Sequence, residues 1–171
     1  MFKKIICFLF FAVFISSCAQ KNTDTFKAEV VANFELSKFL GLWYEIANYD
    51  GKNDENNVIL EFYADKIGEV SVMKSSNIGE KPQKLQVSTL NFPLGSTVGS
   101  FEINKFMLKK TYNIVKIEPN YDYALIFSDD GKELFMLSRT KTMPEIIRYL
   151  YSQSAKNNGF DLKKLNWVKQ K

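Results

Sequence analysis

The chain has 171 residues, with 15 Phe, 8 Tyr and no His. This length suffices for one domain with a sizeable core, and the aromatic content and balanced charge exclude a disordered chain. The formal net charge is +4, and Lys3 and Lys4 supply two of these charges, which leaves 21 basic and 19 acidic residues. This balance, without a basic helix or zinc-ligand spacing, argues against a nucleic-acid partner.

The absence of histidine removes the usual general base and the commonest metal ligand. The sequence also has no Gly-x-Ser-x-Gly motif, no phosphate-binding loop and no metal-ligand cluster. Its two cysteines, Cys7 and Cys18, both lie in the N-terminal segment. We therefore expect a protein that is not an enzyme and that uses no metal and no cofactor.

Residues 1–17 are typical of a signal peptide, with a basic start and an apolar run from Ile5 to Ile15. This run is too short to span a bilayer permanently. It ends in Ile15-Ser16-Ser17-Cys18, which resembles the bacterial lipobox, where cleavage precedes a cysteine that becomes acylated. We expect a lipid anchor on Cys18, a tether over residues 18–27 and a folded domain over residues 28–171. The alternative is an ordinary secretory signal with a chance cysteine.

The folded part begins with a predicted strand over Leu40–Ala47, preceded by a short helical turn. Strict alternation places Trp43, Glu45 and Ala47 on one face of this strand. Gly41 predicts a sharp bend of the backbone, with the large Trp43 ring filling the space beneath it. Taken alone, this pattern most often marks a core anchor.

Seven further segments have the composition of strands and are separated by turn sequences. They are Val58–Ala64, Glu69–Lys74, Lys84–Asn91, Thr97–Asn104, Thr111–Glu118, Tyr121–Ser128 and Glu133–Arg139. Eight consecutive strands at short spacing predict an up-and-down barrel or a sandwich. Leu134–Leu137 is apolar on both faces, which favours a barrel with a helix outside and ligand space inside.

One helix follows the strands. Thr142-Met143-Pro144-Glu145 predicts its start, with Thr142 as N-cap and Glu145 as the third residue of a capping box. Asn157-Asn158-Gly159 predicts its end, and residues 160–168 predict a short final strand. An apolar stripe at helical spacing predicts that the helix packs against the barrel. The stripe consists of Met143, Ile146, Ile147, Leu150 and Tyr151.

This order of elements resembles that of a lipocalin. Gly41-x-Trp43-Tyr44-Glu45 resembles the first signature of that family, Asn120-Tyr121 stands where the second is expected, and Arg139 stands where the third has a basic residue. The segments Phe34–Ala47 and Gly159–Val168 are most similar to the bacterial outer-membrane lipoprotein lipocalins. Only the tyrosine of the second signature is clear, and residues 65–110 carry no recognised motif.

The resemblance implies an all-β fold: an eight-stranded up-and-down antiparallel barrel, one C-terminal α-helix packed outside, and a short ninth strand. It also implies binding and transport or storage of small hydrophobic ligands, with fatty acids or lysophospholipids favoured. Ala19 after the cysteine favours the outer membrane, and we expect the periplasmic face. A scaffold or inhibitor whose mouth loops bind another protein remains the alternative, and a homodimer is left open.

The resemblance further implies that the Arg139 guanidinium packs on the Trp43 ring at the closed end, as a structural pair. We expect Glu45 inside the barrel, either bonded to Arg139 or a tyrosine or in contact with a ligand head group. Strand alternation proposes cavity residues, each of which could instead belong to the wall or core. They are Leu60, Phe62, Phe101, Tyr112, Ile114, Tyr121 and Tyr123.

Lys105–Lys110 should form a loop at the open end of the barrel. Its apolar residues Phe106, Met107 and Leu108 are unusual on a solvated loop. We hypothesise that they touch lipid while Lys109 and Lys110 meet anionic head groups. The alternative is that this segment simply continues the strands.

Overall fold

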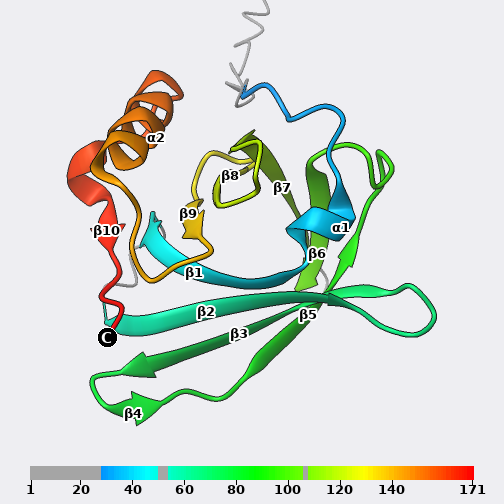
Figure 1. Cartoon of the computed structure of the whole chain (residues 1–171), viewed down its shortest axis with the longest axis horizontal. Helices are drawn as coiled ribbons and strands as arrows, with labels where there is room; N and C mark the ends of the chain where they lie inside the picture. The colour runs from blue at the N-terminus through cyan, green and yellow to red at the C-terminus, as the bar shows by residue number, and fades with distance from the viewer. Residues whose placement is uncertain (1–27, 50–53, 106–107) are drawn as a thin grey trace, which may run out of the picture.

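The computed structural model describes residues 28–49, 54–105 and 108–171. Its strands form one antiparallel sheet that closes on itself as a barrel, with a helix on the outside (Figure 1). The predicted signal peptide, the tether with Cys18, and the loop residues Phe106 and Met107 lie outside the described residues. None of the helices in the described part is long and apolar enough to cross a membrane.

The eight barrel strands follow one another in chain order around the sheet, and β9 closes it by pairing with β1. They are β1 (Gly41–Asn48), β2 (Glu55–Ala64), β3 (Val70–Ile78), β5 (Gln86–Asn91), β6 (Ser100–Lys105), β7 (Leu108–Ile117), β8 (Tyr123–Ser128) and β9 (Leu134–Ser138). Two short strands are added: β4 (Lys81–Pro82) pairs with β3, and β10 (Asn166–Trp167) pairs with β1. The predicted eight-stranded antiparallel barrel is confirmed.

A bulge in β1 changes the side to which its residues point. The register between β1 and β9 shifts between Glu45 and Ala47. Trp43 lies in the inner core and Glu45 lines the barrel interior, whereas Ala47 joins Ile46 in the cluster beneath the outer helix. The prediction that Ala47 shares a face with Trp43 and Glu45 is therefore wrong, because a bulge adds one residue and interrupts strict alternation.

The outer helix, α2 (Glu145–Asn157), covers the barrel on one side. Its Tyr151 and Ala155 are buried in a cluster with Leu125 and Phe127 of β8. The predicted capping box is wrong: Pro144 occupies the N-cap and no side chain caps the helix. The Thr142 carbonyl instead accepts hydrogen bonds from the hydroxyls of Ser138, the last residue of β9, and Thr140.

The predicted apolar stripe of α2 is only partly buried. Met143 and Tyr151 are 2% and 1% exposed, but Ile146 and Leu150 are 60% and 49% exposed. Beyond the helix, most of the predicted final strand is replaced by η1 (Leu162–Lys164), a 3₁₀ turn, so that only β10 pairs with the sheet.

The closed end of the barrel is filled by α1 (Leu36–Phe39) and the Trp43 ring. Phe39 packs on Trp43 with ring centroids 5.1 Å apart, and both side chains are buried. The Arg139 guanidinium carbon lies 3.8 Å from the centre of the Trp43 ring, as the resemblance implied. Gly41 has φ +96°, and a Cβ there would lie 3.4 Å from Arg139 Nη1, so this bend requires glycine.

Arg139 also binds the backbone of three separate segments. Its Nη2 donates to the carbonyls of Lys38 at 2.6 Å and Leu40 at 2.9 Å, and its Nη1 donates to that of Leu42 at 2.8 Å. Its Nε donates to the Tyr121 carbonyl at 3.2 Å. The last carbonyls of a helix have no partner within the helix. The guanidinium therefore ties the end of α1 and the turn before β8 to β1.

We predict that Arg139→Lys lowers the free energy of unfolding by about 2–3 kcal/mol, because an ammonium group cannot reach these carbonyls together or stack flat on the indole. Urea denaturation would measure this change. Arg148→Lys on α2 is the matched control, since Arg148 donates to one carbonyl there, and it should stay within about 0.5 kcal/mol of the wild type. Equal losses in the two variants would contradict the prediction.

Candidate ligand-binding site

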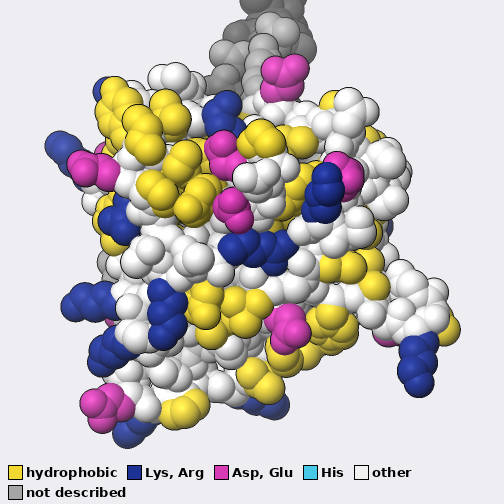
Figure 2. All heavy atoms as spheres, viewed as in Figure 1, with side chains coloured by type: hydrophobic (Ala, Val, Ile, Leu, Met, Phe, Trp, Pro, Cys, Tyr) yellow, Lys and Arg dark blue, Asp and Glu magenta, His cyan; other side chains and the backbone are white. Residues whose placement is uncertain are grey.

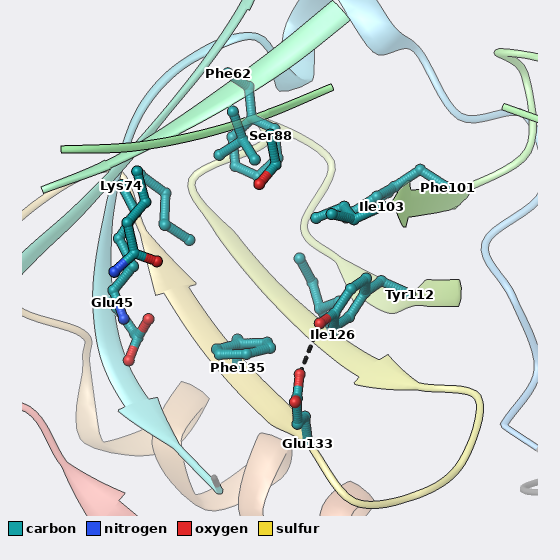
Figure 3. Close-up of a pocket in the computed structure, with 13 residues that line it drawn as sticks. Glu45, Phe62, Lys74, Ser88, Phe101, Ile103, Tyr112, Ile126, Glu133 and Phe135 are labelled. Carbon is teal, nitrogen blue, oxygen red and sulfur yellow. Dashed lines mark hydrogen bonds between the residues drawn. The ribbon is translucent and has the colours of Figure 1, made fainter. Parts of the chain in front are cut away.

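A cavity of about 220 Å³ occupies the barrel interior above the Trp43 end and is partly open to solvent. It extends from Phe62, which pairs with Gly41 at the closed end, to Lys74 and Gln86, which pair near the opposite rim. All eight barrel strands, or the residue next to them, contribute to its wall (Figure 3). The lining residues are Glu45, Leu60, Phe62, Val72, Lys74, Gln86, Ser88, Phe101, Ile103, Tyr112, Ile126, Glu133 and Phe135.

Aromatic rings form much of the wall. The Phe101 ring stacks on that of Tyr112 with centroids 5.7 Å apart, and it meets the Phe62 ring edge-on at 6.3 Å. The Phe135 ring also lies near Tyr112, with the two ring centroids 6.1 Å apart. Apolar area removed from water is the main source of affinity in such a space, so these rings suit a hydrophobic ligand.

Charged groups interrupt this apolar wall on one side. The Lys74 ammonium group lies 2.6 Å from the Glu55 carboxylate, and both Lys74 and Glu45 line the cavity (Figure 3). Glu45 is 1% exposed, and Asn48 Nδ2 donates to its Oε1 at 2.6 Å. Asn48 thus takes a role that we expected of Arg139 or a tyrosine. The amide contact offsets part of the cost of burying a carboxylate.

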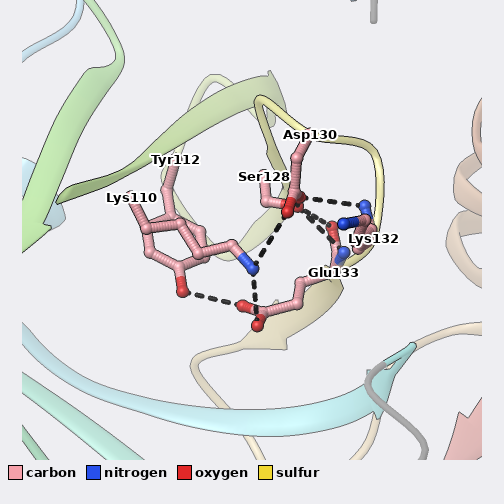
Figure 4. A network of polar contacts seen from close by, with 6 residues as sticks. All are labelled: Lys110, Tyr112, Ser128, Asp130, Lys132 and Glu133. Atoms are coloured by element: carbon pink, nitrogen blue, oxygen red, sulfur yellow. Dashed lines mark hydrogen bonds and ion pairs between the residues drawn. The ribbon is translucent and has the colours of Figure 1, made fainter. Parts of the chain in front are cut away.

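A network of hydrogen bonds and ion pairs lies at the rim next to Tyr112 (Figure 4). The Tyr112 hydroxyl donates to Glu133 Oε2 at 2.7 Å, while Lys110 Nζ lies 2.7 Å from Glu133 Oε1 and 3.5 Å from Asp130 Oδ2. Ser128 Oγ donates to Asp130 at 2.6 Å. In the described part of the chain, no cluster of acidic side chains has the arrangement of a metal site.

The network shifts the pKa values of its members. Burial and the adjacent Glu133 carboxylate raise the pKa of the Tyr112 phenol well above its ordinary value. Burial disfavours the charged form of Lys110, but Glu133 and Asp130 outweigh it and raise its pKa. Burial likewise opposes the charge of Asp130, yet hydrogen bonds from Ser128 and the Lys132 N–H, together with Lys110, lower its pKa.

Four of the proposed cavity residues, Leu60, Phe62, Phe101 and Tyr112, line the cavity. Ile114 is 0% exposed in the inner core and is not among the lining residues. Contact of the four lining residues with a ligand stays a prediction. Alternation along β2, β6 and β7 was a sound guide because Leu60 and Phe62 follow the register shift in β2, and Tyr112 precedes the one in β7.

The two remaining candidates lie outside the cavity. Tyr121 has φ +60° in the turn before β8, and its hydroxyl accepts the Glu35 N–H at 2.8 Å at the closed end. Tyr123 starts β8 and packs in the outer cluster, where its carbonyl accepts the Tyr151 hydroxyl at 3.1 Å. We had placed both on one strand and one face. The left-handed turn between them breaks that alternation, so the inward placement of Tyr123 is wrong.

The predicted mouth loop is shorter than expected. Lys105 and Leu108 are register partners, so β6 and β7 extend to either side of residues 106–107. Lys109 pairs with Glu102 at 3.5 Å, and its side chain is 72% exposed, whereas Lys110 belongs to the rim network. Contact of this loop with lipid stays a prediction, since Phe106 and Met107 lie outside the described residues.

Sequence reasoning missed eight of the thirteen residues that line the cavity. Val72 and Lys74 share one parity on β3, and Gln86 and Ser88 share one on β5, so alternation was an available signal. No motif marks that region of the chain. Phe135 lies in a segment that is apolar on both faces, where alternation carries no information.

A model of the lipocalin-like domain family matches residues 34–170. The chain belongs to this family. This lipocalin is 30% identical over 145 residues to Outer membrane lipoprotein Blc of Vibrio cholerae, with 82% of this chain and 85% of the relative covered. The protein of that name from Escherichia coli K12 is 26% identical over 163 residues, with 93% and 92% covered. Insecticyanin from the tobacco hornworm Manduca sexta has a similar fold: TM-score 0.63 at 19% identity, covering 82% of this chain and 83% of that one.

The rim network predicts a stability that falls at alkaline pH. Because the pKa of Tyr112 is raised in the folded state, its contribution is complete below the ordinary tyrosine pKa of about 10 and is lost as pH rises through the folded value. Tyr112→Phe should cost about 1 kcal/mol at neutral pH and should remove up to about 1.4 kcal/mol per pH unit from the alkaline slope. Urea denaturation across this range tests it, and parallel curves for both proteins would contradict it.

Proposed function

We propose that this lipocalin binds single-chain amphiphiles, such as fatty acids or lysophospholipids, in the barrel cavity and stores or carries them at the membrane. The observation that carries the proposal is the cavity of about 220 Å³, with aromatic walls and charged groups at its rim. An apolar tail gains free energy from burial there, and a polar head can stay near the rim groups and solvent.

The cavity volume favours one chain over two. An apolar cavity of about 150 Å³ holds a benzene molecule, so about 220 Å³ corresponds to about nine heavy atoms. One acyl chain can fill this space with its terminal part, and the rest of a longer chain would extend through the rim. A second chain would need space that the wall does not provide.

The lipobox at Cys18 and the similarity to the outer-membrane lipoproteins of Vibrio cholerae and Escherichia coli support a lipid-anchored outer-membrane protein. We place it on the periplasmic face, beside a source of single-chain lipids. We also propose binding without catalysis, because the chain has no histidine and the rim groups Tyr112, Glu133 and Lys110 are engaged with one another. Native mass spectrometry of the purified chain would identify a co-purified lipid.

A filled cavity should abolish ligand binding without unfolding the barrel. Ser88 lines the cavity, and Thr89, the next residue on β5, is exposed on the outer face. We predict that Ser88→Trp weakens binding of a fluorescent fatty acid at least about tenfold, since the indole takes up the apolar space. Thr89→Trp is the matched control and should bind as the wild type does, with the same circular dichroism spectrum in all three proteins.

Equal binding by Ser88→Trp and the wild type would place the ligand elsewhere. Absence of any bound or displaceable lipid from the wild type at micromolar concentrations would favour the alternative, a protein-partner role for the mouth loops.

The affinity for a fatty acid should rise with the length of its acyl chain only until the chain fills the cavity. Each additional buried methylene is worth about 0.8 kcal/mol, or about fourfold in affinity. We predict that displacement constants for saturated fatty acids improve at this rate up to about nine carbons and then level off. A continued fourfold gain per methylene through much longer chains would show that the cavity expands on binding.

A further inference from the structure

The outer side of α2 presents an apolar surface to solvent. Ile146, Tyr149 and Leu150 are 60%, 58% and 49% exposed, and their spacing places them on one face of the helix. Trp167 of β10 is 44% exposed and lies beside the helix, with the Arg148 guanidinium 5.5 Å from its ring centre. Figure 2 shows hydrophobic side chains gathered over α2. We call Ile146, Tyr149, Leu150 and Trp167 the α2 face.

Positive charge is concentrated in the same part of the chain. Residues 141–171 carry seven basic and two acidic side chains, a net charge of +5, whereas residues 1–140 carry 16 basic and 17 acidic ones. Arg148 is half-buried and the other six basic residues are exposed. The basic residues are Lys141, Arg148, Lys156, Lys163, Lys164, Lys169 and Lys171. An apolar face on a segment with an excess of exposed basic residues is the composition that binds anionic membrane surfaces.

The position of the N-terminal segment brings this face within reach of a membrane anchor. Ala28 packs in the cluster beneath α2, and residues 28–32 line a groove together with Ser154 and Asn158 near the end of that helix. Ten residues separate Cys18 from Ala28, which allows a span of at most about 35 Å. The 13-residue helix is about 20 Å long. Acyl chains on Cys18 would therefore hold α2 close to the bilayer.

We propose that the α2 face docks on the anionic lipid surface of the membrane in which Cys18 is anchored. The inference rests on the proposed anchor, and it is independent of what the cavity binds. A second copy of the chain is a poorer occupant: a two-fold contact through this face would bring two segments of charge +5 together. Anionic head groups instead neutralise the basic residues, while the tyrosine and tryptophan rings suit the membrane interface.

Fluorescence of the lipidated full chain in vesicles tests this docking. Trp43 is fully buried at the closed end, so quenching by brominated phospholipids reports on Trp167, and Trp167→Phe gives the background. We expect quenching in phosphatidylcholine vesicles that contain phosphatidylglycerol. This quenching should be weaker at high salt, and it should also be weaker in vesicles of phosphatidylcholine alone. The variant Ile146→Ser/Tyr149→Ser/Leu150→Ser should lose the quenching. The control Ile67→Ser/Leu94→Ser, at residues that are 87% and 63% exposed in loops of the closed end, should keep it.

Vesicle flotation separates the failures. A chain that floats with vesicles but shows only background quenching would overturn the docking and leave the anchor standing. A chain that does not float with vesicles of either composition would overturn both the anchor and the docking. A concentration-dependent dimer that the triple serine variant abolishes would assign the face to a second copy and overturn the proposal. None of these outcomes changes the displacement of fatty acid from the cavity, which tests the proposed function separately.

Discussion

The stacking of Arg139 on Trp43 is the interaction on which the architecture of this lipocalin depends. One guanidinium covers the indole and satisfies carbonyls from α1, β1 and the turn before β8. These segments are far apart in sequence, so their convergence closes one end of the barrel. Because Trp43, Phe39 and Phe34 fill that end, open volume inside the barrel can exist only toward the other rim.

Charged side chains have different partners at the closed end and at the open end of the barrel. At the closed end Arg139 is surrounded by carbonyl oxygens, and burial lowers its pKa more than the charge of Asp122 raises it. At the rim, carboxylates of Glu133 and Asp130 meet Lys110 within hydrogen-bonding or ion-pair distance. The rim charges remain close to solvent, where desolvation costs less. The charged groups of the rim can therefore border the apolar cavity without occupying it.

The fold was largely predictable because strands, turns and the outer helix each leave a local pattern of apolar residues. The cavity was predictable only where that pattern runs unbroken, as for Leu60, Phe62 and Phe101. It failed at the bulge after Glu45 and at the left-handed turn of Tyr121, since one inserted residue or one positive φ reverses the faces that follow. The capping box failed because the helix begins after Pro144, while the Thr142 carbonyl accepts hydrogen bonds from the Ser138 and Thr140 hydroxyls.

The apolar stripe of α2 shows why burial cannot be inferred from helical spacing alone. At about 100° per residue, Tyr151 and Ala155 point toward the barrel, whereas Ile146 and Leu150 lie more than about 90° away around the helix. A helix resting on a barrel needs an apolar arc of only about 100°. The arc of α2 is much wider than that, and its excess lies within residues 141–171, the segment whose net charge is +5. Packing on the barrel accounts for the part of this arc around Tyr151 and Ala155, and the proposed docking of the α2 face on the membrane would account for the rest.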